Sequence, residues 1–320
     1  MRGAMDGDGT AAETSRTSRP PPGVSVIVVT WNTRAALRRC LTAITGRAAE
    51  IIVVDNGSGD GTAEMVAADY PEVILVALPE NLGFGAGVNR GARAARGEAL
   101  LLLNPDTEPA SGAIDVLARH LGETPRCGAA GARLVSANGE PQAGFAVRRF
   151  PTLASWAIDL LLVDQVWPGN PITRRYLALD LHPEATATVD QPAAAALMVR
   201  RRAFDAIGGM DETFVPAWFE DVDLCRRLHD AGWDIAYVPA AVIRHEGGLA
   251  MRALGPRFQS IWYANMLRYA RKHEAPATVA ALRALIVVGM AMRIGVAALR
   301  LDADDVRAYG RALAVGLRGR

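Results

Sequence analysis

Two short apolar runs, each leading into an aspartate, stand out in the hydrophobic pattern of this chain. Residues 51–54 are isoleucine and valine and lead into Asp55, and residues 99–103 are alanine and leucine and lead into a loop that contains Asp106. Runs of this length and composition predict buried parallel strands. Because ligands bind outside the carboxyl ends of strands in open α/β sheets, the pattern predicts one site built from two strand ends.

Strand and helix patterns alternate through the rest of the N-terminal half. Further strands are predicted at 24–29 and 73–78. The predicted helices, in which apolar residues recur at helical spacing, cover 33–44, 61–70, 84–96 and 111–121. This alternation predicts an α/β fold with a doubly wound, mostly parallel sheet.

The pattern changes after about residue 125. The elements predicted there are strands at 128–135, 187–199, 235–238 and 242–244 and helices at 201–207 and 220–231. An irregular, proline-rich insert that contains Trp156, Trp167 and Tyr176 separates the first two of these strands. Long irregular segments are often functional, so the insert is either an acceptor-side region or lid, or a packed surface subdomain.

Composition and the N-terminal residues narrow the class of protein. The 320-residue chain has a formal net charge of +1, which gives no basis for a nucleic-acid partner. Cys40, Cys127 and Cys225 lie far apart without metal-ligand spacing, as expected in a reduced compartment. Residues 1–22 lack the apolar segment of a secretory signal and are rich in Gly, Ser, Thr, Asp, Arg and Pro. We therefore expect a cytoplasmic protein with a disordered N-terminal tail.

Six short motifs occur in order between residues 24 and 250. They are VSVIVVTWN at 24–32, IVVDNGS at 52–58, NLGFGAGVNRG at 81–91, NPDT at 104–107, FEDVDL at 219–224, and His245 with Gly247 and Gly248. As an ordered set they resemble the inverting family 2 glycosyltransferases, which have the GT-A fold and use nucleotide-diphospho-sugar donors. Within that family the likeness is to bacterial rhamnosyltransferase-type proteins.

The resemblance implies a domain organisation and a reaction. It implies a GT-A catalytic domain at 23–250, with a donor half at 23–125 and an acceptor half at 126–250, followed by a helical extension at 251–320. The implied reaction moves a sugar, for which the motif set suggests rhamnose, from a UDP- or dTDP-sugar to a hydroxyl of a glycan or lipid-linked glycan, with inversion.

Several polar residues are candidates for binding the nucleotide-sugar. Thr30, Asn32 and Asp55 end the first two strands, where a carboxylate can accept hydrogen bonds from a nucleobase imide or a ribose hydroxyl. By resemblance, Asp55 contacts the uracil or thymine ring; the alternative is that it caps the turn that follows. Asn81 and Asn89, in the glycine-rich segment, are candidate sugar or phosphate contacts.

Asp106 and His245 are the candidate ligands of a divalent metal, magnesium or manganese. A metal ion that bridges diphosphate oxygens stabilises the charge of the leaving group, and hard cations prefer oxygen ligands. The family uses an Asp-x-Asp motif here, whereas this chain has Asn104 at the first position, which leaves Asp106 as the main carboxylate. By resemblance, His245 completes the site. The alternatives are a turn aspartate and a structural histidine.

The helix predicted at 220–231 indicates a catalytic base by the direction of its side chains. Asp221 lies on the same side as the apolar Leu224 and Leu228, where an unpaired carboxylate would be costly. Asp223 lies about 200° away with Arg227 as an i,i+4 partner, so we interpret it as a solvated helix charge. By resemblance, Asp221 is the base of an inverting displacement. The alternative is a helix N-terminal aspartate that interacts with the helix dipole.

Two neighbours of this aspartate are assigned to the acceptor. Trp218 is in a position to stack on a sugar face, although an aromatic residue there is equally typical of a core, and Glu220 is assigned to acceptor binding. The glycine-rich 85–91 also approximates a dinucleotide fingerprint, so a nicotinamide-dependent oxidoreductase is one alternative function. A non-catalytic member of a glycan-assembly complex is another.

The C-terminal segment 277–301 is very apolar but contains Arg283, Arg293 and Arg300. These arginines fall within about a third of a turn and leave a wide apolar face. An amphipathic basic helix of this kind can lie in a membrane interface, here as a peripheral contact on the cytoplasmic face of the inner membrane. The alternative is a helix docked on the catalytic domain or on a second subunit, and the sequence is also compatible with a homo-oligomer.

Overall fold

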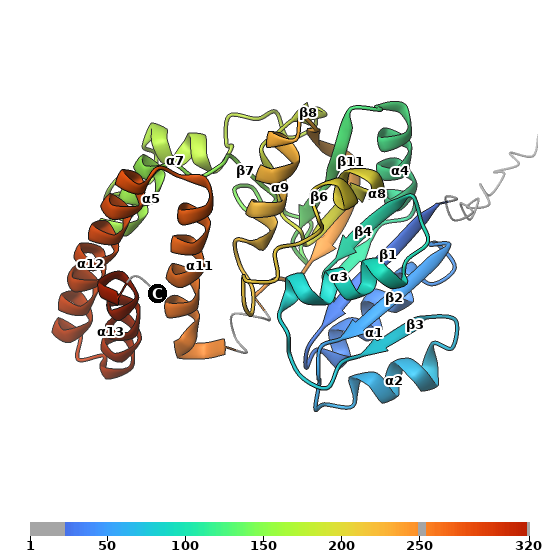
Figure 1. Ribbon diagram of the computed structural model, residues 1–320, viewed down its shortest axis with the longest axis horizontal. Coiled ribbons are helices and arrows are strands. Elements are labelled where there is room, and N and C mark those ends of the chain that lie inside the picture. The colour runs from blue at the N-terminus through green and yellow to red at the C-terminus, as the bar shows by residue number, and fades with distance from the viewer. Residues whose placement is uncertain (1–22, 249–253, 319–320) are drawn as a thin grey trace, which may run out of the picture.

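The computed structural model describes residues 23–248 and 254–318. It contains a mixed sheet beside a group of C-terminal helices (Figure 1). The tail predicted at 1–22 and the domain boundary predicted at 250/251 lie outside the described residues. The main sheet has the strand order β3-β2-β1-β4-β10-β6-β11-β5, with β8 paired to β11, and β7 and β9 form a separate pair. These strands are β1 Val24–Thr30, β2 Glu50–Asp55, β3 Ile74–Ala77, β4 Ala99–Leu103, β5 Thr107–Pro109, β6 Cys127–Val135, β7 Val147–Arg148, β8 Ala187–Thr188, β9 Gln191–Pro192, β10 Ala196–Arg200 and β11 Asp234–His245.

The first four strands are parallel, and their register aligns the carboxyl ends. Thr30 pairs with Asp55, which in turn pairs with Ala77 of β3, while Val28 pairs with Leu103 at the end of β4. β10 is antiparallel to both β4 and β6 and joins the two halves into one sheet. The two acidic loops predicted from the apolar runs therefore lie at the same edge of the sheet.

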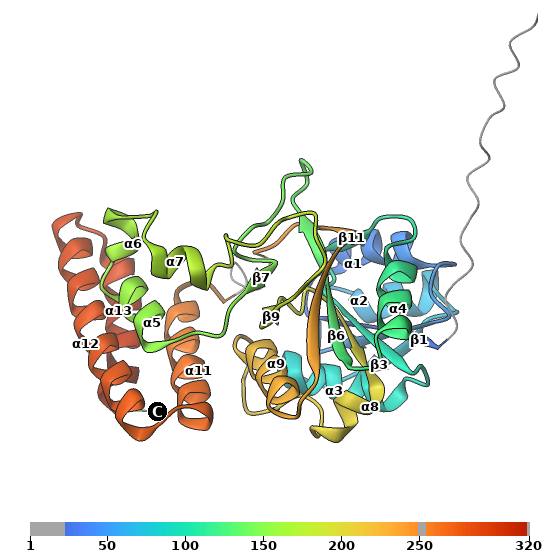
Figure 2. The same cartoon turned by 90° about the horizontal axis from the view of Figure 1, so that it is seen from above.

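Helices cover both faces of the sheet, as Figure 2 shows from above. They are α1 Arg34–Ile44, α2 Thr62–Asp69, α3 Phe84–Ala94, α4 Ala113–Glu123, α8 Arg201–Ala206 and α9 Glu220–Asp230. The apolar residues of α1 and α4, such as Leu37 and Leu117, are buried in one core cluster. Those of α3, α8 and α9, such as Val88, Phe204 and Leu224, belong to a second cluster. The predicted doubly wound α/β architecture is confirmed.

The glycines of α3 let this helix lie directly on β1 and β2. A Cβ atom added to Gly87 would stand 2.6 Å from Val29 Cγ1, and one added to Gly91 would stand 2.5 Å from Ile27 Cγ2 and 3.2 Å from Val54 Cγ2. The segment is thus a small-residue packing helix under the edge of the sheet.

This close packing gives a stability prediction. We expect Gly91→Ala to lower the free energy of unfolding by about 1–3 kcal/mol, because the added methyl group overpacks a core of stiff β-branched residues. Gly122→Ala in α4 is the matched control, since nothing lies within 4 Å of the position that its added Cβ would take and alanine favours a helix. Urea unfolding of both variants measures the difference, and equal stability of the two would contradict the packing argument.

The acceptor half differs from the predicted elements in three places. The strand predicted at 187–199 is wrong: β8, β9 and β10 are separate strands, and β9 pairs with β7 rather than with the main sheet. The two strands predicted at 235–238 and 242–244 are one strand, β11, with a register shift between Val238 and Val242. The insert predicted to be irregular contains three helices, α5 Leu153–Leu160, α6 Val163–Val166 and α7 Pro171–Tyr176.

Caps that the sequence contains explain two of the missed helices. Thr152 and Ser155 form a capping box at the start of α5, and Asn170 caps α7 before a proline at its first position. Trp156 on α5 is buried against Tyr269 of the C-terminal helices, whereas Trp167 is 59% exposed. The insert is therefore a packed subdomain on the side that faces the helical extension.

The C-terminal extension consists of η1 Gly255–Arg257 and the helices α11 Phe258–His273, α12 Pro276–Leu299 and α13 Ala303–Arg318. Together with α5 they bury a third apolar cluster around Tyr269, Leu282 and Ile286. Arg283 Nη2 donates to the carbonyl oxygen of Leu317 at 2.9 Å, and Arg293 Nη2 donates to that of Asp159 at 2.8 Å.

These two arginines therefore fasten α12 to the C-terminal ends of α13 and α5, where backbone carbonyls lack intrahelical partners. The prediction that they form the polar face of an interfacial helix is wrong for both, and α12 is docked on this side. Its other side exposes Val288, Met292 and Val296, which are 41–49% accessible. Among the described residues, α12 is the one helix whose length and composition would allow it to cross a bilayer. The most apolar 18-residue window of this helix has a mean hydropathy of 1.9, and 22% of that window is buried.

Candidate active site

The loops after β1 and β2 are joined by hydrogen bonds at the edge of the sheet. The backbone N–H of Asn32 donates to Ser58 Oγ, and the N–H of Gly59 donates to Asn32 Oδ1, both at 2.8 Å. Asn32 has a φ of +52°, a left-handed conformation that asparagine tolerates better than most residues. The buried Thr30 shares a hydrogen bond of 2.7 Å with Thr33.

Asp55 lies buried beside these loops. Its Oδ1 accepts the N–H of Ser58 at 3.3 Å, so the turn-capping interpretation is present in the structure. Burial raises the pKa of Asp55 although the hydrogen bonds from Ser58 oppose this. A buried carboxylate of this kind is stabilised by a ligand that donates a hydrogen bond to it.

Asn56, which the motif analysis did not single out, organises the next part of this edge. Its Nδ2 donates to Asn81 Oδ1 at 2.9 Å, and its Oδ1 accepts the N–H of Leu82 at 3.0 Å. The Asn81 oxygen also accepts the N–H of Gly83 at 2.9 Å. Asn81 therefore lies at the edge of the sheet where it was predicted, and its side-chain oxygen already accepts hydrogen bonds from Asn56 and Gly83. In the sequence, the one feature that could have indicated this role of Asn56 was its uncharged amide directly after Asp55.

Asp106 and His245 come together at the other end of the edge. His245 Nε2 is 3.6 Å from Asp106 Oδ1, and both side chains are about 5% exposed. Asp106 Oδ2 accepts the N–H of Gly247 at 3.0 Å. His245 Nδ1 is 2.9 Å from Gln142 Oε1, and Phe145 stacks on the imidazole with ring centroids 5.2 Å apart.

These surroundings fit a divalent cation. With Nδ1–H donated to Gln142, the bare Nε2 of His245 faces a carboxylate oxygen, and burial lowers the pKa of His245 and favours the neutral imidazole. Two ligands of one ion stand about 3–3.5 Å apart, close to the observed separation. Among the described residues, no group of three or more His, Cys, Asp or Glu side chains is placed to hold a metal. The remaining ligands would be supplied by water and by a ligand such as a diphosphate.

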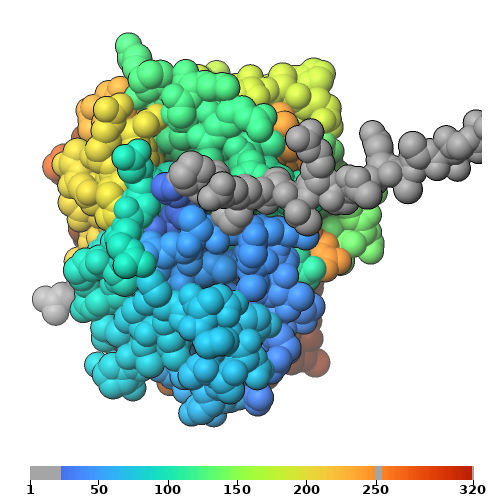
Figure 3. Space-filling view, turned by 90° about the vertical axis from the view of Figure 1, so that its right-hand side faces the viewer, coloured from blue at the N-terminus to red at the C-terminus, as the bar shows by residue number. Residues whose placement is uncertain are grey.

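An open hollow of about 630 Å³ lies between the start of α1, the loop after β2 and the residue that follows His245. Its lining includes Asn32 of the loop after β1, Arg34 and other residues of the first turns of α1, Asp60 of the loop after β2, and Glu246 next to the histidine. Figure 3 shows the part of the molecule coloured blue to cyan, to which β1, β2 and these two loops belong, at one end of the surface.

Asp221, at the start of α9, reaches the same region from the acceptor half. Its Oδ2 accepts a hydrogen bond from Gln191 Nε2 at 3.2 Å and one from the N–H of Ala194 at 3.3 Å. The carbonyl oxygen of the next residue, Ala195, accepts the N–H of Asn104 at 3.0 Å in the loop that contains Asp106. Asp221 and the loop that contains Asp106 are thus connected by the segment before β10.

The electrostatics of Asp221 suit a proton acceptor. Burial raises its pKa above the usual value of an aspartate, while the hydrogen bond from Ala194 opposes that shift. A general base is most effective when its pKa approaches the operating pH. Gln191 orients this carboxylate through its hydrogen bond. Gln191 was not identified from the sequence, because the two residues are 30 positions apart and nothing in the local sequence indicates their contact.

Comparisons with known proteins identify the chain. A family model described as Glycosyl transferase family 2 matches residues 25–180. The N-acetylglucosaminyl-diphospho-decaprenol L-rhamnosyltransferase of Mycobacterium tuberculosis is 35% identical over 236 residues, which are 69% of this chain and 75% of that protein. The chain belongs to glycosyl transferase family 2. The predicted family is confirmed, and the oxidoreductase alternative is overturned.

Solved structures confirm the GT-A fold of this family 2 glycosyltransferase. GalNAc-T7 with UDP, GalNAc and Mn2+ superimposes with a TM-score of 0.58 at 16% identity, over 78% of this chain and 48% of that one. The mannosyltransferase PcManGT from Pyrobaculum calidifontis, in complex with GDP-Man and Mn2+, gives 0.55 at 17% identity, over 95% and 90%. A further relative, the pre-mycofactocin glycosyltransferase of Mycobacterium tuberculosis, is 29% identical over 73% of this chain and 46% of that protein.

The surroundings of three other predicted residues of this glycosyltransferase are as follows. Asn89 uses its amide on the loop before α9: Nδ2 donates to the carbonyl oxygen of Met210, and Oδ1 accepts the Met210 N–H, both at 2.9 Å. The structure therefore does not bring its amide to the donor edge. Trp218 packs edge-on against Phe258 of α11 with centroids 4.6 Å apart, as an aromatic core residue would. Glu220 is buried, its Oε2 has no hydrogen-bond partner, and burial raises its pKa well above the usual value.

The interpretation of Asp223 as a solvated helix charge is wrong. The side chain is fully buried and bonded to Arg227, Lys272 and His273. The prediction failed because the second layer of helices, which covers this face of α9, is not visible in the periodicity of α9 itself. Asp221, which was predicted to share the buried side of Leu224 and Leu228, is half-buried and accepts hydrogen bonds from Gln191 and Ala194.

Proposed function

We propose that this glycosyltransferase moves a sugar, with L-rhamnose as the first candidate, from a UDP- or dTDP-linked donor to a hydroxyl of a lipid-linked glycan, with inversion. The observation that carries the proposal is that Ala194 and Ala195 connect Asp221 by hydrogen bonds with Asn104, in the loop whose Asp106 faces His245. The rhamnosyltransferase relative, whose name includes a decaprenol-linked N-acetylglucosamine, supports the sugar and the lipid-linked acceptor.

Each part of the site has a task in such a transfer. The acceptor oxygen forms a bond to the anomeric carbon as the bond from that carbon to the diphosphate breaks, and Asp221 takes the hydroxyl proton. Asp55, Thr30 and Asn32 would hold the nucleoside, and Asn81 would contact the sugar or the phosphate. Asp106 and His245 would bind a divalent ion, Mg²⁺ or Mn²⁺, which stabilises the charge of the leaving diphosphate.

Inversion is tested by the anomeric configuration of the product. With dTDP-β-L-rhamnose as donor and a soluble lipid-diphosphate N-acetylglucosamine analogue as acceptor, we expect an α-linked product by NMR. A β-linked product would contradict a single displacement. The non-catalytic assembly role would be favoured instead if no UDP- or dTDP-sugar supports transfer and the protein binds no nucleotide.

The raised pKa of Asp221 gives a pH prediction. The base acts in its ionised form, so kcat should fall as pH decreases through the pKa of Asp221. Because burial raises that pKa, the acidic limb should have its midpoint above the value of about 3.9 that is typical of an exposed aspartate. Rates measured between about pH 4 and 8 test this, and a profile that is flat down to pH 4 would exclude Asp221 as the base.

We propose a membrane contact for the outer face of α12. Val288, Met292, Val296 and Leu299 lie at helical spacing and are 41–88% exposed. A core helix of this composition would be mostly buried, whereas 22% of the most apolar window of α12 is. A peripheral contact at the cytoplasmic face of the inner membrane would hold the enzyme near a lipid-linked acceptor.

Vesicle binding tests this contact. Wild type should float with phosphatidylglycerol-containing vesicles, and the double variant Val288→Glu, Met292→Glu should lose most of this binding, because two charges would enter the interface. Leu179→Glu, which changes an apolar residue 38% exposed outside α12, is the control. If wild type stays in solution and instead forms dimers that the double variant abolishes, α12 is an interface between copies.

A further inference from the structure

The segment that leads into α9 has an unusual backbone. Trp218 and Phe219, directly before Glu220 and Asp221, both have left-handed φ angles, +75° and +71°. Bulky residues rarely adopt this conformation, and it persists only where the surrounding structure enforces it. The start of the catalytic helix is therefore held by contacts from outside its own sequence.

Helix α11 of the C-terminal extension supplies these contacts. Trp262 lies 6.2 Å from Trp218 and 5.1 Å from Phe219 between ring centroids, and Tyr269 lies 5.8 Å from Phe219. Between these rings the buried Asn265 donates from Nδ2 to the carbonyl oxygen of Ala217 at 2.8 Å. Successive turns of α11 thus follow the segment into α9.

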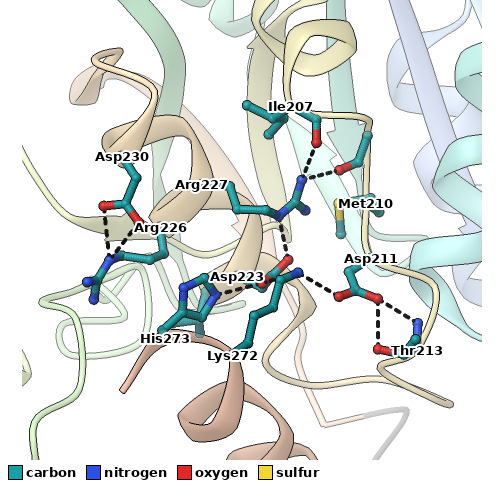
Figure 4. Close-up of polar contacts among 12 residues, drawn as sticks. Ile207, Met210, Asp211, Thr213, Asp223, Arg226, Arg227, Asp230, Lys272 and His273 are labelled. Carbon is teal, nitrogen blue, oxygen red and sulfur yellow. Dashed lines mark hydrogen bonds and ion pairs between the residues drawn. The ribbon is translucent and has the colours of Figure 1, made fainter. Parts of the chain in front are cut away.

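The last turn of α11 holds α9 itself through a buried carboxylate (Figure 4). Asp223 Oδ1 is 2.8 Å from both Lys272 Nζ and His273 Nε2, and Asp223 Oδ2 accepts from Arg227 Nε at 2.8 Å. The Asp223 side chain is 0% exposed and that of His273 is 7% exposed. Asp223 thus has ion-pair partners from its own helix and from α11.

The same cluster reaches the loop before α9. Lys272 Nζ is 2.6 Å from Asp211 Oδ2, and Arg227 Nη1 donates to the carbonyl oxygens of Ile207 and Gly209 at 2.9 and 2.7 Å. Figure 4 shows Lys272 between the two carboxylates. Asn89 of α3 bonds to Met210 in this loop, so the cluster connects α11 with a helix of the donor half.

The charges of the cluster keep it closed at neutral pH. Burial by itself would raise the pKa of Asp223, but the hydrogen bond from His273 and the charges of Arg227 and Lys272 outweigh it and hold the pKa below the usual value. The pKa of Asp211 is lowered to about 2 because its bonds to Lys272 and Thr213 outweigh its own burial. Both carboxylates are therefore ionised when the enzyme works.

We propose that Lys272 and His273 are positioning residues for sugar transfer, which hold Asp223 and thereby fix α9 so that the Asp221 carboxylate faces the acceptor hydroxyl. Asp221 and Asp223 point to different sides of α9, so the cluster acts on the base from behind and touches no substrate. This inference rests on the proposed role of Asp221 as base. It makes the C-terminal extension a working part of the active site.

Two substitutions in α11 test the proposal while leaving the carboxylate of Asp223 in place. Lys272→Met and His273→Ala should each lower kcat by about 10- to 100-fold, because a displacement of about 1 Å at the reacting group costs that much. The KM for the donor and its binding measured by calorimetry should stay within about twofold of wild type, since Asp106 and His245 are untouched. Rates are expressed per folded molecule, with the folded fraction taken from thermal unfolding.

The conservative variants and a matched control separate positioning from general stability. Lys272→Arg and His273→Gln retain a donor toward Asp223 and should recover most of kcat. Asp230→Asn removes the other i,i+4 ion pair of α9, whose partner Arg226 is 3.1 Å away, and should leave kcat unchanged. Full activity per folded molecule in Lys272→Met and His273→Ala, or an equal loss in Asp230→Asn, would overturn the proposal.

The outcome is distinguishable from failure of the proposed function. If Asp221→Asn is inactive while both α11 variants are fully active, the positioning role alone is wrong. If Asp221→Asn transfers sugar normally, the base assignment has failed, and with it the reason for placing α9 so accurately. Asp223→Asn is a weaker test because it leaves Arg227 and His273 without their charged partner and endangers folding.

Discussion

Asp221→Asn is expected to lower kcat by about three orders of magnitude while the affinity for donor nucleotide changes by less than about twofold. An amide cannot take the acceptor proton, but it can still accept the hydrogen bonds from Gln191 and from the backbone of Ala194. The measurement is steady-state transfer together with calorimetric titration of the nucleotide. Loss of nucleotide binding in this variant would instead make Asp221 a structural residue.

Thermal unfolding supplies the control for this variant. Burial raises the pKa of Asp221 in the folded protein, so at neutral pH its ionised form is less favourable there than in the unfolded chain. Removing that charge should leave Tm unchanged or raise it. A lower Tm together with lost activity would indicate damage to the fold, and the loss could not be assigned to chemistry.

The second large effect is expected at the Asp106–His245 pair. Asp106→Asn and His245→Ala should each weaken Mn²⁺-dependent nucleotide binding by about 100-fold or more, because the described residues offer two ligand side chains at this point. Gln142→Leu should weaken it by about 10- to 100-fold, since the hydrogen bond to Nδ1 sets the tautomer of His245.

The matched control is His229→Ala, which removes a histidine 64% exposed on α9. It should bind nucleotide and metal as wild type does. Wild-type Mn²⁺ dependence in both Asp106→Asn and His245→Ala would show that the pair holds no catalytic ion, and the diphosphate would then have to be neutralised by basic side chains such as Arg34.

The first four strands could be predicted from sequence because they are short apolar runs flanked by turn residues. Asp55 and Asp106 followed from the same pattern, since parallel strands end at one edge. His245 depended on the family resemblance, because a single histidine after a strand is usually structural. Its position beside Asp106 was settled by the pairing of β11 with β5, a contact between residues more than a hundred positions apart.

What the sequence did not predict depends on contacts between the two halves and the C-terminal helices. The periodicity of α9 could not show that α11 covers Asp223. Arg283 and Arg293 looked like the polar face of an amphipathic helix, yet they bond to carbonyl oxygens of other helices. In each case a charged residue finds its partner in tertiary structure, and local spacing carries no signal of that partner.

Calorimetric titration of UDP and of dTDP into wild type, with and without Mn²⁺, tests the central claim most directly. We predict that one of the two nucleotides binds, that Mn²⁺ strengthens its binding by about 100-fold or more, and that Asp106→Asn removes this gain. Binding of neither nucleotide under either condition would contradict a nucleotide-sugar site at this edge of the sheet.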